Sequence, residues 1–313
     1  MQTIHLSYPM KQAKAFAFPS QILAIGEFDG VHLGHQEVIR RTVQRAKPLD
    51  VPAAIMTFHP HPREVLGQAQ YVRILTPLEE KLELFSKLGV HHTYVVSFNE
   101  TFSKVTPERF VDDMLIPLGM ETVVVGFDFR FGHKGAGTPD TLCEHGKGRF
   151  AVEVVRPFSL NGQKVSSTFV RECLSSGNVD KACALLGRPY RIQGHVVSGR
   201  ARGRTIGFPT ANIELSAPYV LPVNGVYGVN IIIDGVTHNG IMNLGVRPTF
   251  EEGETQPSIE VHIFDFDGDI YGKHVTVELL YFLRPEKKFA SVEELVGQIR
   301  QDIRQCKARH AAL

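Results

Sequence analysis

The spacing of apolar segments changes near residue 187, and this change constrains the fold more than any other feature of the sequence. Before it, apolar segments typical of strands alternate with stretches long enough for helices. These segments are 22–26, 53–58, 93–98, 122–126 and 151–155. Alternating strands and helices predict a parallel sheet with helices on both faces. The first half is therefore expected to be an α/β domain.

Local start and stop signals support helices between these strands. The segment 76–88 opens with the capping pattern Thr76-Pro77-Leu78-Glu79, and Gly89 is suited to end it. A further helix is predicted from Thr106-Pro107 to the residue before Pro117.

The second half has a different rhythm. Helices are expected over 168–187, with Asn178 as a cap and Gly187 as a stop. Strand-like segments then follow with no amphipathic helix between them: 191–198, 226–233, 237–244, 258–266 and 274–282. This pattern predicts an antiparallel barrel or sandwich. A last helix is predicted from the capping box at Ser291 to about Arg309. We therefore expect two domains, 1–187 and 188–313.

Composition describes an ordinary globular protein of 313 residues, with 43% hydrophobic and 21% charged residues. The formal net charge of +1 gives no bulk electrostatic reason to bind nucleic acid or a membrane surface. No apolar stretch reaches the length of a membrane span, and the first residues do not resemble a secretory signal. The four cysteines, Cys143, Cys173, Cys183 and Cys306, match no metal or redox pattern, which predicts a reducing cytoplasm.

The segment 26–35 carries the clearest chemical signal. It reads Gly-Glu-Phe-Asp-Gly-Val-His-Leu-Gly-His and follows the apolar run 21–25, so it occupies a strand–turn–helix junction. Glycines allow backbone N–H groups to approach a phosphate, and a helix N-terminus adds partial positive charge. His32 and His35 add hydrogen-bond donors. The HxGH element resembles the signature of nucleotidylyltransferases, which act on the α-phosphate of a nucleoside triphosphate. The alternative is a tight turn with two exposed histidines.

Three further segments of the first half are compatible with a nucleotide site. Thr57–Pro62 contains two histidines, and its prolines favour a rigid loop over a zinc site. Gly126–Gly132 alternates Phe with Asp128 and Arg130, which suits either a flat ring ligand or a core strand end. Ser166-Ser167-Thr168 with Arg171 is suited to an anion site at a helix start, and equally to a helix-capping cluster.

Basic and glycine residues mark the start of the second half. Five arginines fall within 188–204: Arg188, Arg191, Arg200, Arg202 and Arg204. Glycines at 194, 199, 203 and 207 are interspersed, and Phe208-Pro209-Thr210-Ala211-Asn212 follows. Such a loop can fold over polyphosphate, and the Thr210 hydroxyl and Asn212 amide oxygen are suitable Mg²⁺ ligands. The alternatives are a solvated basic loop or an RNA contact, although no aromatic residues are interleaved with the arginines.

The segment 259–264 alternates along its length. Ile259, Val261 and Ile263 are expected on one face of a strand, and Glu260 and His262 on the other. If Glu260 faces a cleft, it is a candidate general base for an alcohol, and otherwise it is a surface glutamate.

Taken together, the ordered motifs resemble the bacterial bifunctional riboflavin kinase/FAD synthetase (FMN adenylyltransferase) family over nearly the whole chain. In the first half the resemblance rests on Gly26–His35, Thr57–Pro62, Gly126–Gly132 and Ser166–Thr168 with Arg171. In the second half it rests on Gly194–Gly199, Gly207–Asn212, Gly225–Tyr227, Asn243–Phe250 and Glu260–Lys273.

The resemblance implies a Rossmann-like nucleotidylyltransferase domain with a parallel sheet, followed by an antiparallel β-barrel domain with a terminal helix. The barrel would transfer the γ-phosphate of ATP to the 5′-hydroxyl of riboflavin and give FMN. The first domain would transfer AMP from a second ATP to FMN, giving FAD and pyrophosphate. Mg²⁺ is the implied metal ion. Riboflavin, FMN and ATP are the implied partners, with no nucleic acid or membrane.

The resemblance also implies residue roles. For adenylylation, ATP would contact Gly26, Phe28, Asp29, Gly30, His32, Gly34, His35, Ser166, Ser167, Thr168 and Arg171, with His32 and His35 catalytic. Asp128 and Phe131 would contact the flavin. For the kinase, ATP would contact Gly199, Gly207, Pro209, Thr210 and Asn212, with Thr210 and Asn212 on the metal and Glu260 as catalytic base.

Two rival classes remain at this point. One is a nucleotidylyltransferase whose barrel only binds a regulator, which the presence of Thr210, Asn212 and Glu260 disfavours. The other is an RNA-binding protein that uses the basic loop, which the near-zero net charge disfavours.

Overall fold

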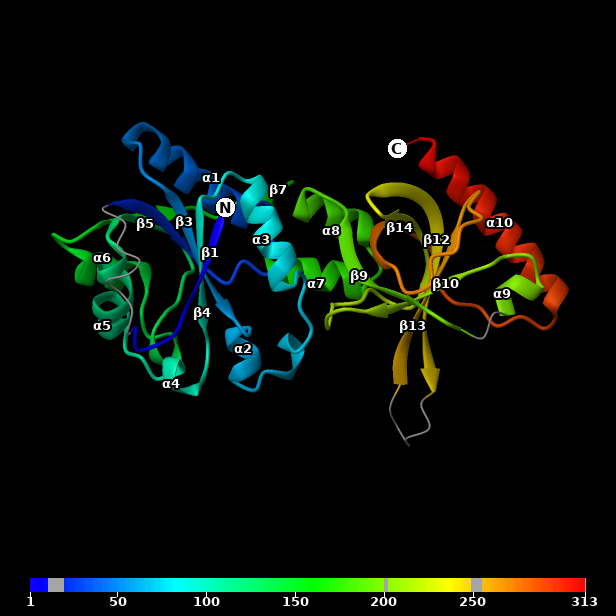
Figure 1. Ribbon diagram of the computed structural model, residues 1–313, viewed down its shortest axis with the longest axis horizontal. Coiled ribbons are helices and arrows are strands. Elements are labelled where there is room, and N and C mark those ends of the chain that lie inside the picture. The colour runs from blue at the N-terminus through cyan, green and yellow to red at the C-terminus, as the bar shows by residue number, and fades with distance from the viewer. Residues whose placement is uncertain (11–19, 200–201, 249–254, 313) are drawn as a thin grey trace. The chain divides into compact units, whose positions relative to one another are not determined.

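The computed structural model describes residues 1–10, 20–199, 202–248 and 255–312. The chain forms two compact units, Met1–Ser167 and Thr168–Leu313. The two are described separately below, with the elements labelled in Figure 1.

The first unit is built on a sheet of six parallel strands in the order β1-β4-β3-β2-β5-β6 (Figure 1). The strands are β1 (Gln2–Leu6), β2 (Gln21–Ile25), β3 (Ala53–His59), β4 (His92–Ser97), β5 (Met120–Gly126) and β6 (Ala151–Val155). The parallel sheet and five of its strands are confirmed predictions. The prediction lacked β1, a five-residue edge strand whose pairing with β4 depends on residues far along the chain.

Helices connect these strands: α1 (Leu33–Ala46), α2 (Pro62–Val65), α3 (Leu78–Lys87), α4 (Glu100–Ser103), α5 (Pro107–Phe110) and α6 (Pro139–Gly146). Short 3₁₀ turns span Lys47–Leu49, Ala69–Tyr71, Ile116–Leu118 and His133–Gly135, and a π-turn spans Val111–Leu115. A hairpin of β7 (Ser159–Leu160) and β8 (Gln163–Lys164) follows β6.

Two predicted helix ends are wrong. The predicted cap of α3 fails because its N-cap is Pro77, which supplies no side-chain hydrogen bond, and the N–H of Thr76 instead donates to Asp29. The helical segment that starts at Thr106 continues past Pro117 as a 3₁₀ turn and ends at Gly119, whose φ is +68°. Proline at the second position of a 3₁₀ turn loses no hydrogen bond, so it does not stop the chain there.

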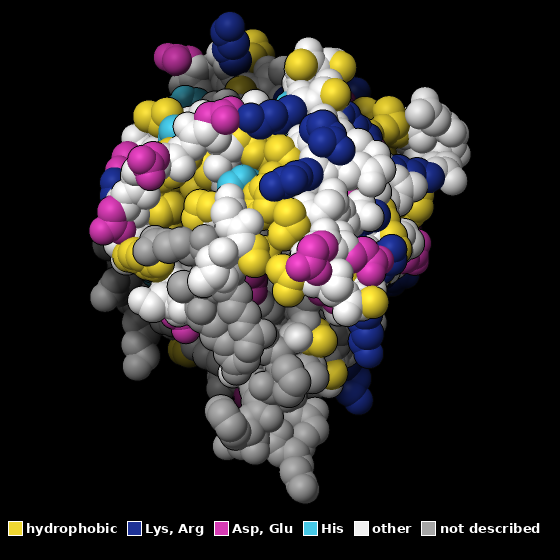
Figure 2. Space-filling model, turned by 90° about the vertical axis from the view of Figure 1, so that its right-hand side faces the viewer, with side chains coloured by type: hydrophobic (Ala, Val, Ile, Leu, Met, Phe, Trp, Pro, Cys, Tyr) yellow, Lys and Arg dark blue, Asp and Glu magenta, His cyan; other side chains and the backbone are white. Residues whose placement is uncertain are grey.

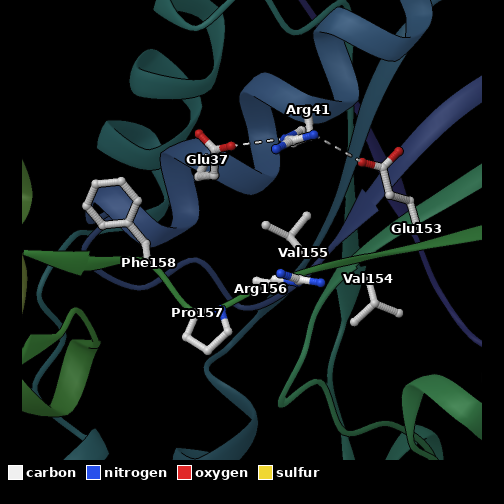
Figure 3. Close-up of a pocket in the computed structure, with 8 residues that line it drawn as sticks. All are labelled: Glu37, Arg41, Glu153, Val154, Val155, Arg156, Pro157 and Phe158. Carbon is white, nitrogen blue, oxygen red and sulfur yellow. Dashed lines mark hydrogen bonds and ion pairs between the residues drawn. The ribbon is translucent and has the colours of Figure 1, made fainter.

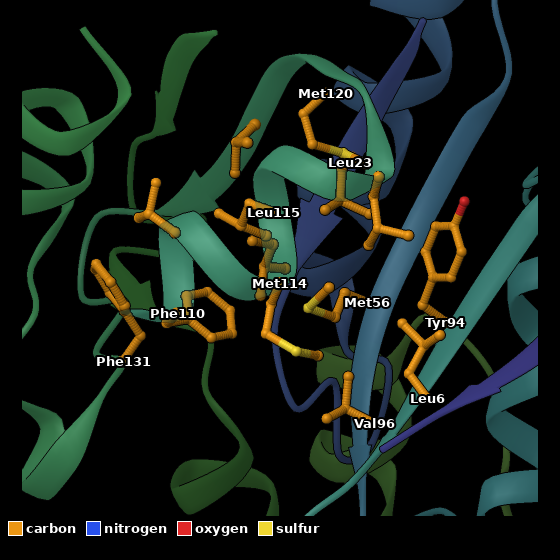
Figure 4. Packing of buried hydrophobic residues seen from close by; sticks show 14 of the residues in the cluster. Leu6, Leu23, Met56, Tyr94, Val96, Phe110, Met114, Leu115, Met120 and Phe131 are labelled. Atoms are coloured by element: carbon orange, nitrogen blue, oxygen red, sulfur yellow. The ribbon is translucent and has the colours of Figure 1, made fainter. Parts of the chain in front are cut away.

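Alternate residues of the central strands form separate cores on the two faces of the sheet. Leu23, Met56 and Tyr94 pack with Phe110 and the other residues shown in Figure 4 on one face. The residues between them in the strands pack on the opposite face against α1 and α3 in a second cluster, which contains Ile22, Ala24, Ile55, Ile39 and Phe85. Burial on both faces explains why these strands are continuously apolar.

The second unit is a closed barrel in which every neighbouring pair of strands is antiparallel. The order is β10-β13-β12-β11-β14-β9, with β9 (Tyr190–Val197), β10 (Ala211–Leu215), β11 (Gly225–Ile233), β12 (Val236–Pro248), β13 (Thr255–Ile263) and β14 (His274–Arg284). Its helices are α7 (Ser167–Ser175, of which Thr168 onward belongs to this unit), α8 (Val179–Leu186), α9 (Arg202–Thr205) and α10 (Val292–His310). The predicted caps at Asn178 and Ser291 and the left-handed stop at Gly187 are confirmed.

The final helix is fixed to the barrel by polar contacts as well as by packing. Tyr281 on β14 donates to the carbonyl oxygen of Cys306 on α10 at 3.1 Å. The guanidinium of Arg284 contacts both carboxylate oxygens of the buried Asp302, with distances of 2.7–3.1 Å. A charged pair held in this way ties the end of β14 to the middle of α10.

Two candidate active sites

The HxGH segment lies where the strand order of the first unit changes direction. The chain builds β3 and β4 on one side of β2, and β5 and β6 on the other. Open parallel sheets bind ligands at such a switch point, outside the carboxyl ends of the strands. The loop after β2 and the loop after β5 both leave the sheet there. The structure therefore puts the segments 26–35 and 126–132 at one edge of the sheet.

His32 is the N-cap of α1 and is 5% exposed. Its Nδ1 accepts a hydrogen bond from the backbone N–H of His35 at 3.2 Å. The two imidazole rings are stacked, with centroids 3.6 Å apart and an angle of 18° between planes. Because Nδ1 is the acceptor, a neutral His32 carries its proton on Nε2. That nitrogen is then a donor at a helix N-terminus, which is suited to an anionic ligand.

The loop before α1 has an unusual backbone. Phe28, Gly30 and Val31 have φ values of +54°, +86° and +41°. A β-branched residue in this region is strained, and such strain is found at ligand sites. Gly26 serves the fold, because a Cβ there would lie 3.0 Å from the ring of Phe28. That buried ring packs edge-on against His35, with centroids 5.3 Å apart.

Asp29 and Ser167 hold this loop in place. The buried carboxylate of Asp29 accepts hydrogen bonds from the backbone N–H groups of Leu75 and Thr76 at 2.9 and 3.1 Å. Ser167 donates its hydroxyl proton to the carbonyl oxygen of Asp29 at 2.8 Å. Asp29 and Ser167, two of the predicted ATP contacts, thus stabilise the conformation of this loop. Ser166 also lies in the first unit, whereas Thr168 and Arg171 belong to the second.

The segment after β5 shows the alternation of its phenylalanines only in part. Strand β5 ends at Gly126 and a turn follows, so Phe127 lies apart, whereas Phe129 and Phe131 stack with centroids 5.5 Å apart. Phe127 is 40% exposed and lies under the ammonium of Lys164, which also pairs with Asp128 at 2.8 Å. Phe131 is 6% exposed and belongs to the core shown in Figure 4. Of the two predicted flavin contacts, Asp128 is accessible and Phe131 is packed inside.

The loop after β3 is rigid in the way its prolines predict. His61 caps α2 by accepting from the N–H of Arg63 at 3.1 Å, and its ring stacks on Tyr71 at 4.9 Å. Across the described residues, no group of three or more His, Cys, Asp or Glu side chains is arranged to hold a metal ion.

A pocket of about 460 Å³ lies between α1 and the end of β6. Figure 3 shows Arg41 between Glu37 and Glu153, to which its nitrogens lie at 3.0 and 4.0 Å. Phe158 also lines the pocket, and its Cβ lies 3.6 Å from the point where a side chain on Gly34 would begin. No motif in the sequence indicates this pocket, because its residues come from α1 and from the end of β6 and the segment after it, which lie far apart in the chain.

The second candidate site lies on the outer face of the barrel. The register places Asn212 of β10 opposite Glu260 of β13, and Glu260 opposite Asn243 of β12. The neighbours of Glu260 in β13, Ile259 and Val261, are buried inside the barrel at 2% and 0% exposure. The predicted alternation is therefore confirmed. Three polar side chains form a row across three strands, which no local pattern in the sequence predicted.

Asn212 is only 8% exposed, although it is on the outer face. The backbone of Gly199 lies over it, so closely that a Cβ at Gly199 would be 2.1 Å from the amide nitrogen of Asn212. Thr210 is the residue before β10, and its hydroxyl oxygen lies 3.4 Å from the position that a Cβ on Gly203 would take. The glycines at 199 and 203 thus bring the chain against Asn212 and Thr210.

Glu260 and His262 connect this face to the surrounding chain. Ser258 donates to the carboxylate of Glu260 at 3.3 Å. His262 is 2.7 Å from the carbonyl oxygen of Pro209, which ties the 207–210 segment to β13. Gly207 has a φ of +86°, so this turn requires glycine.

The arginines of the predicted basic loop do not all lie in one loop. Arg191 lies in β9, where its guanidinium pairs with the buried Glu278 at 2.6 Å, so it is part of the barrel wall. Arg200, Thr249 and Phe250 lie outside the described residues, as do the side chains of Arg202 and Arg204.

Two family models match the chain. The family described as FAD synthetase matches residues 17–169, and the family described as riboflavin kinase matches residues 186–310. The bifunctional riboflavin kinase/FMN adenylyltransferase of Bacillus subtilis is 42% identical over 304 residues, covering 96% of each chain. The chain belongs to this bifunctional family. A member from Listeria monocytogenes is 42% identical over 100% of this chain and 99% of its own.

A solved structure has the same fold. It is a crystal structure described as a macrolide-efflux protein from Streptococcus pneumoniae, with a TM-score of 0.89, 33% identity, and coverage of 98% of this chain and 99% of its own. Within the described part of this chain, no helix is long and apolar enough to cross a membrane.

As a riboflavin kinase/FMN adenylyltransferase, the protein makes FMN from riboflavin and FAD from FMN, and ATP is the second substrate of both reactions. Neither reaction requires a covalent intermediate between a substrate and the enzyme. Positioning and charge stabilisation are then the main contributions of the protein.

Proposed function

We propose that the two reactions are divided between the two sites. FMN is adenylylated at the N-terminus of α1, in the first domain (expected as residues 1–187), and riboflavin is phosphorylated on the outer face of the barrel, in the second (expected as residues 188–313). The compact barrel unit already begins at Thr168, because α7 and α8 belong to it. The observation that carries the proposal is the pairing of Asn212 with Glu260 on neighbouring strands of the barrel. Asn212 has an oxygen suited to binding Mg²⁺, and Glu260 has a carboxylate suited to act as a general base, so the two functions that a kinase needs lie side by side.

In the first site His32 and His35 act on the phosphates of ATP. The proton on His32 Nε2 points from a helix N-terminus, and the stack with His35 fixes both rings. These donors stabilise the charge that grows on the α-phosphate as the FMN phosphate attacks it and pyrophosphate leaves. Gly30 and Gly34 allow the backbone to approach, Ser166 and Ser167 add donors, and Asp128 contacts the flavin while the buried Phe131 supports its segment from the core.

In the second site Thr210 and Asn212 hold Mg²⁺ together with ATP. A hydroxyl and an amide oxygen are hard ligands of the kind Mg²⁺ prefers. Gly199 packs directly on the amide of Asn212, so position 199 has no room for a residue larger than glycine unless that amide moves. When bound, the ion neutralises charge on the phosphates. Gly199, Gly207 and Pro209 shape the chain around the nucleotide.

Glu260 is the base for riboflavin. Its carboxylate accepts the proton of the 5′-hydroxyl while the oxygen of that hydroxyl bonds to the γ-phosphorus, and the bond from that phosphorus to ADP breaks. Ser258 orients the carboxylate through its hydrogen bond. The rigid strand and its neighbours restrict the movement of Glu260.

Reciprocal variants test this division. Glu260→Gln should lower kcat of the kinase about 10²–10⁴-fold and leave FAD formation from supplied FMN unchanged. His32→Ala should lower adenylylation about 10²–10³-fold and leave FMN formation unchanged. Glu214→Gln is the matched control, since Glu214 is an exposed glutamate of β10. Equal loss of both activities in either variant would refute separate sites.

The substrates also bear on the location and the partners of the enzyme. The proposal places it in the cytoplasm, where ATP is abundant, and gives it no nucleic-acid partner. Both basic and acidic side chains lie on the described part of the face shown in Figure 2. Lys307 pairs with Asp265 there, and Arg309 pairs with Asp180.

A further inference from the structure

A buried pair of a lysine and a glutamate lies beside the loop that leads into α1. The ammonium of Lys81, on α3, lies 3.1 Å from a carboxylate oxygen of Glu27 and 3.0 Å from the carbonyl oxygen of Glu27. Lys81 is 4% exposed. Lysine is rarely buried to this degree unless it is paired, because removing its charge from water is unfavourable. Neither residue is used in the two reactions as described above.

The carbonyl oxygen of Glu27, which Lys81 contacts, also accepts a hydrogen bond from a second residue. The hydroxyl of Thr57 donates to the same carbonyl oxygen of Glu27 at 3.0 Å. The next residue is Phe28, the first of the three with positive φ, and Asp29 is held by backbone N–H groups. A strained loop keeps its shape only where its surroundings determine it. The contacts at Glu27 fix the start of this loop, and those at Asp29 fix its middle.

We propose that Lys81 and Glu27 are positioning residues for FMN adenylylation, which set the path of the loop and thereby the positions of His32 and His35. The inference rests on the proposed function of those histidines. Loss of Lys81 removes one of two donors to the Glu27 carbonyl and the only charged partner within salt-bridge distance among the described residues. A shift of about 1 Å in a catalytic group lowers a rate on the order of 10²-fold.

Glu27 makes the pair sensitive to pH. Burial, with a smaller contribution from the charge of Asp29, raises the pKa of Glu27 to about 8 against the opposite effects of Lys81 on α3 and Arg63 on α2. Its second carboxylate oxygen is buried and has no hydrogen-bond partner among the described residues. The charged carboxylate is the stronger acceptor for Lys81. Adenylylation should therefore become faster as the pH rises through about 8.

The main test is Lys81→Met in the full-length protein, with Lys87→Met as a matched control. Lys87 is in the same helix, but its side chain is 59% exposed. We expect Lys81→Met to lower kcat of adenylylation about 10²-fold, to change KM for ATP less, and to leave the kinase rate unchanged. Lys87→Met should change neither rate. A normal adenylylation rate in Lys81→Met with an intact kinase would overturn the proposal.

Two further variants provide a test that does not depend on the folding of Lys81→Met. Thr57→Val removes only the hydroxyl donor and should lower adenylylation in the same direction. Glu27→Gln should lose the rise in kcat near pH 8 and keep the pH profile of the kinase. A parental pH profile in Glu27→Gln would overturn the proposal. His32→Ala separates the two levels of inference: if it retains full adenylylation, the proposed site itself is wrong.

Discussion

Gly199→Ala is the change that most directly probes the kinase site. An added methyl group would lie 2.1 Å from the amide nitrogen and 2.6 Å from the Cγ of Asn212. Ordinary contact begins at 3.4 Å, so the amide must move by about 1.3 Å. The φ of Gly199 is outside the left-handed region, so alanine adds no backbone strain. The substitution therefore displaces the Asn212 side chain without straining the backbone at residue 199.

The expected effect is on catalysis and not on folding. The amide is the end of a side chain that can rotate, so the free energy of unfolding should change by less than about 1 kcal/mol. A catalytic ligand displaced by about 1 Å lowers a rate on the order of 10²-fold. FMN formation from riboflavin should therefore fall about 10²-fold, and the Mg²⁺ concentration for half-maximal rate should rise.

The assay separates FMN and FAD by chromatography at several Mg²⁺ concentrations, and FAD formation from supplied FMN reports on the other reaction. Gly297→Ala is the control: it lies in α10 with no atom within 4 Å of the added methyl, and it should stabilise that helix by about 0.5–1 kcal/mol without changing either rate. A parental kinase rate and Mg²⁺ dependence in Gly199→Ala would refute the role given to Asn212.

Three further predictions concern folding and pH. A fragment of residues 185–313 should fold and make FMN but no FAD; an unfolded product from several nearby start points would contradict an independent barrel domain. Asp302→Ala should destabilise the protein by about 3 kcal/mol in denaturant unfolding, because it leaves Arg284 without its buried partner, whereas Lys287→Ala at an exposed pair should change stability by less than about 1 kcal/mol. The folded-state pKa of Glu27 lies above its usual value of 4.5, so its contribution to stability is present below about pH 4.5 and is lost as the pH rises through about 8. Melting temperatures of Glu27→Gln should therefore increase relative to the parent between about pH 5 and pH 9, and a constant difference would contradict the raised pKa.

The sequence alone determined the elements whose causes are local. The start of α1 at His32, the cap at Asn178 and the alternation around Glu260 all depend on residues within one turn or one strand. The change of rhythm near residue 187 was sufficient to predict a parallel sheet followed by an antiparallel barrel or sandwich, and the pairing of the strands decided for the closed barrel. The ordered motifs were sufficient to identify the family and its two activities.

Only the tertiary structure decided which residues meet. Asn212, Glu260 and Asn243 form a row because their strands pair in one register, and register depends on which face of each strand is buried in the closed barrel. The N–H of Thr76 donates to Asp29 just before α3, and Lys81 reaches Glu27, because buried donors and acceptors must be satisfied by whatever group the fold brings near. A local pattern carries no information about such distant partners.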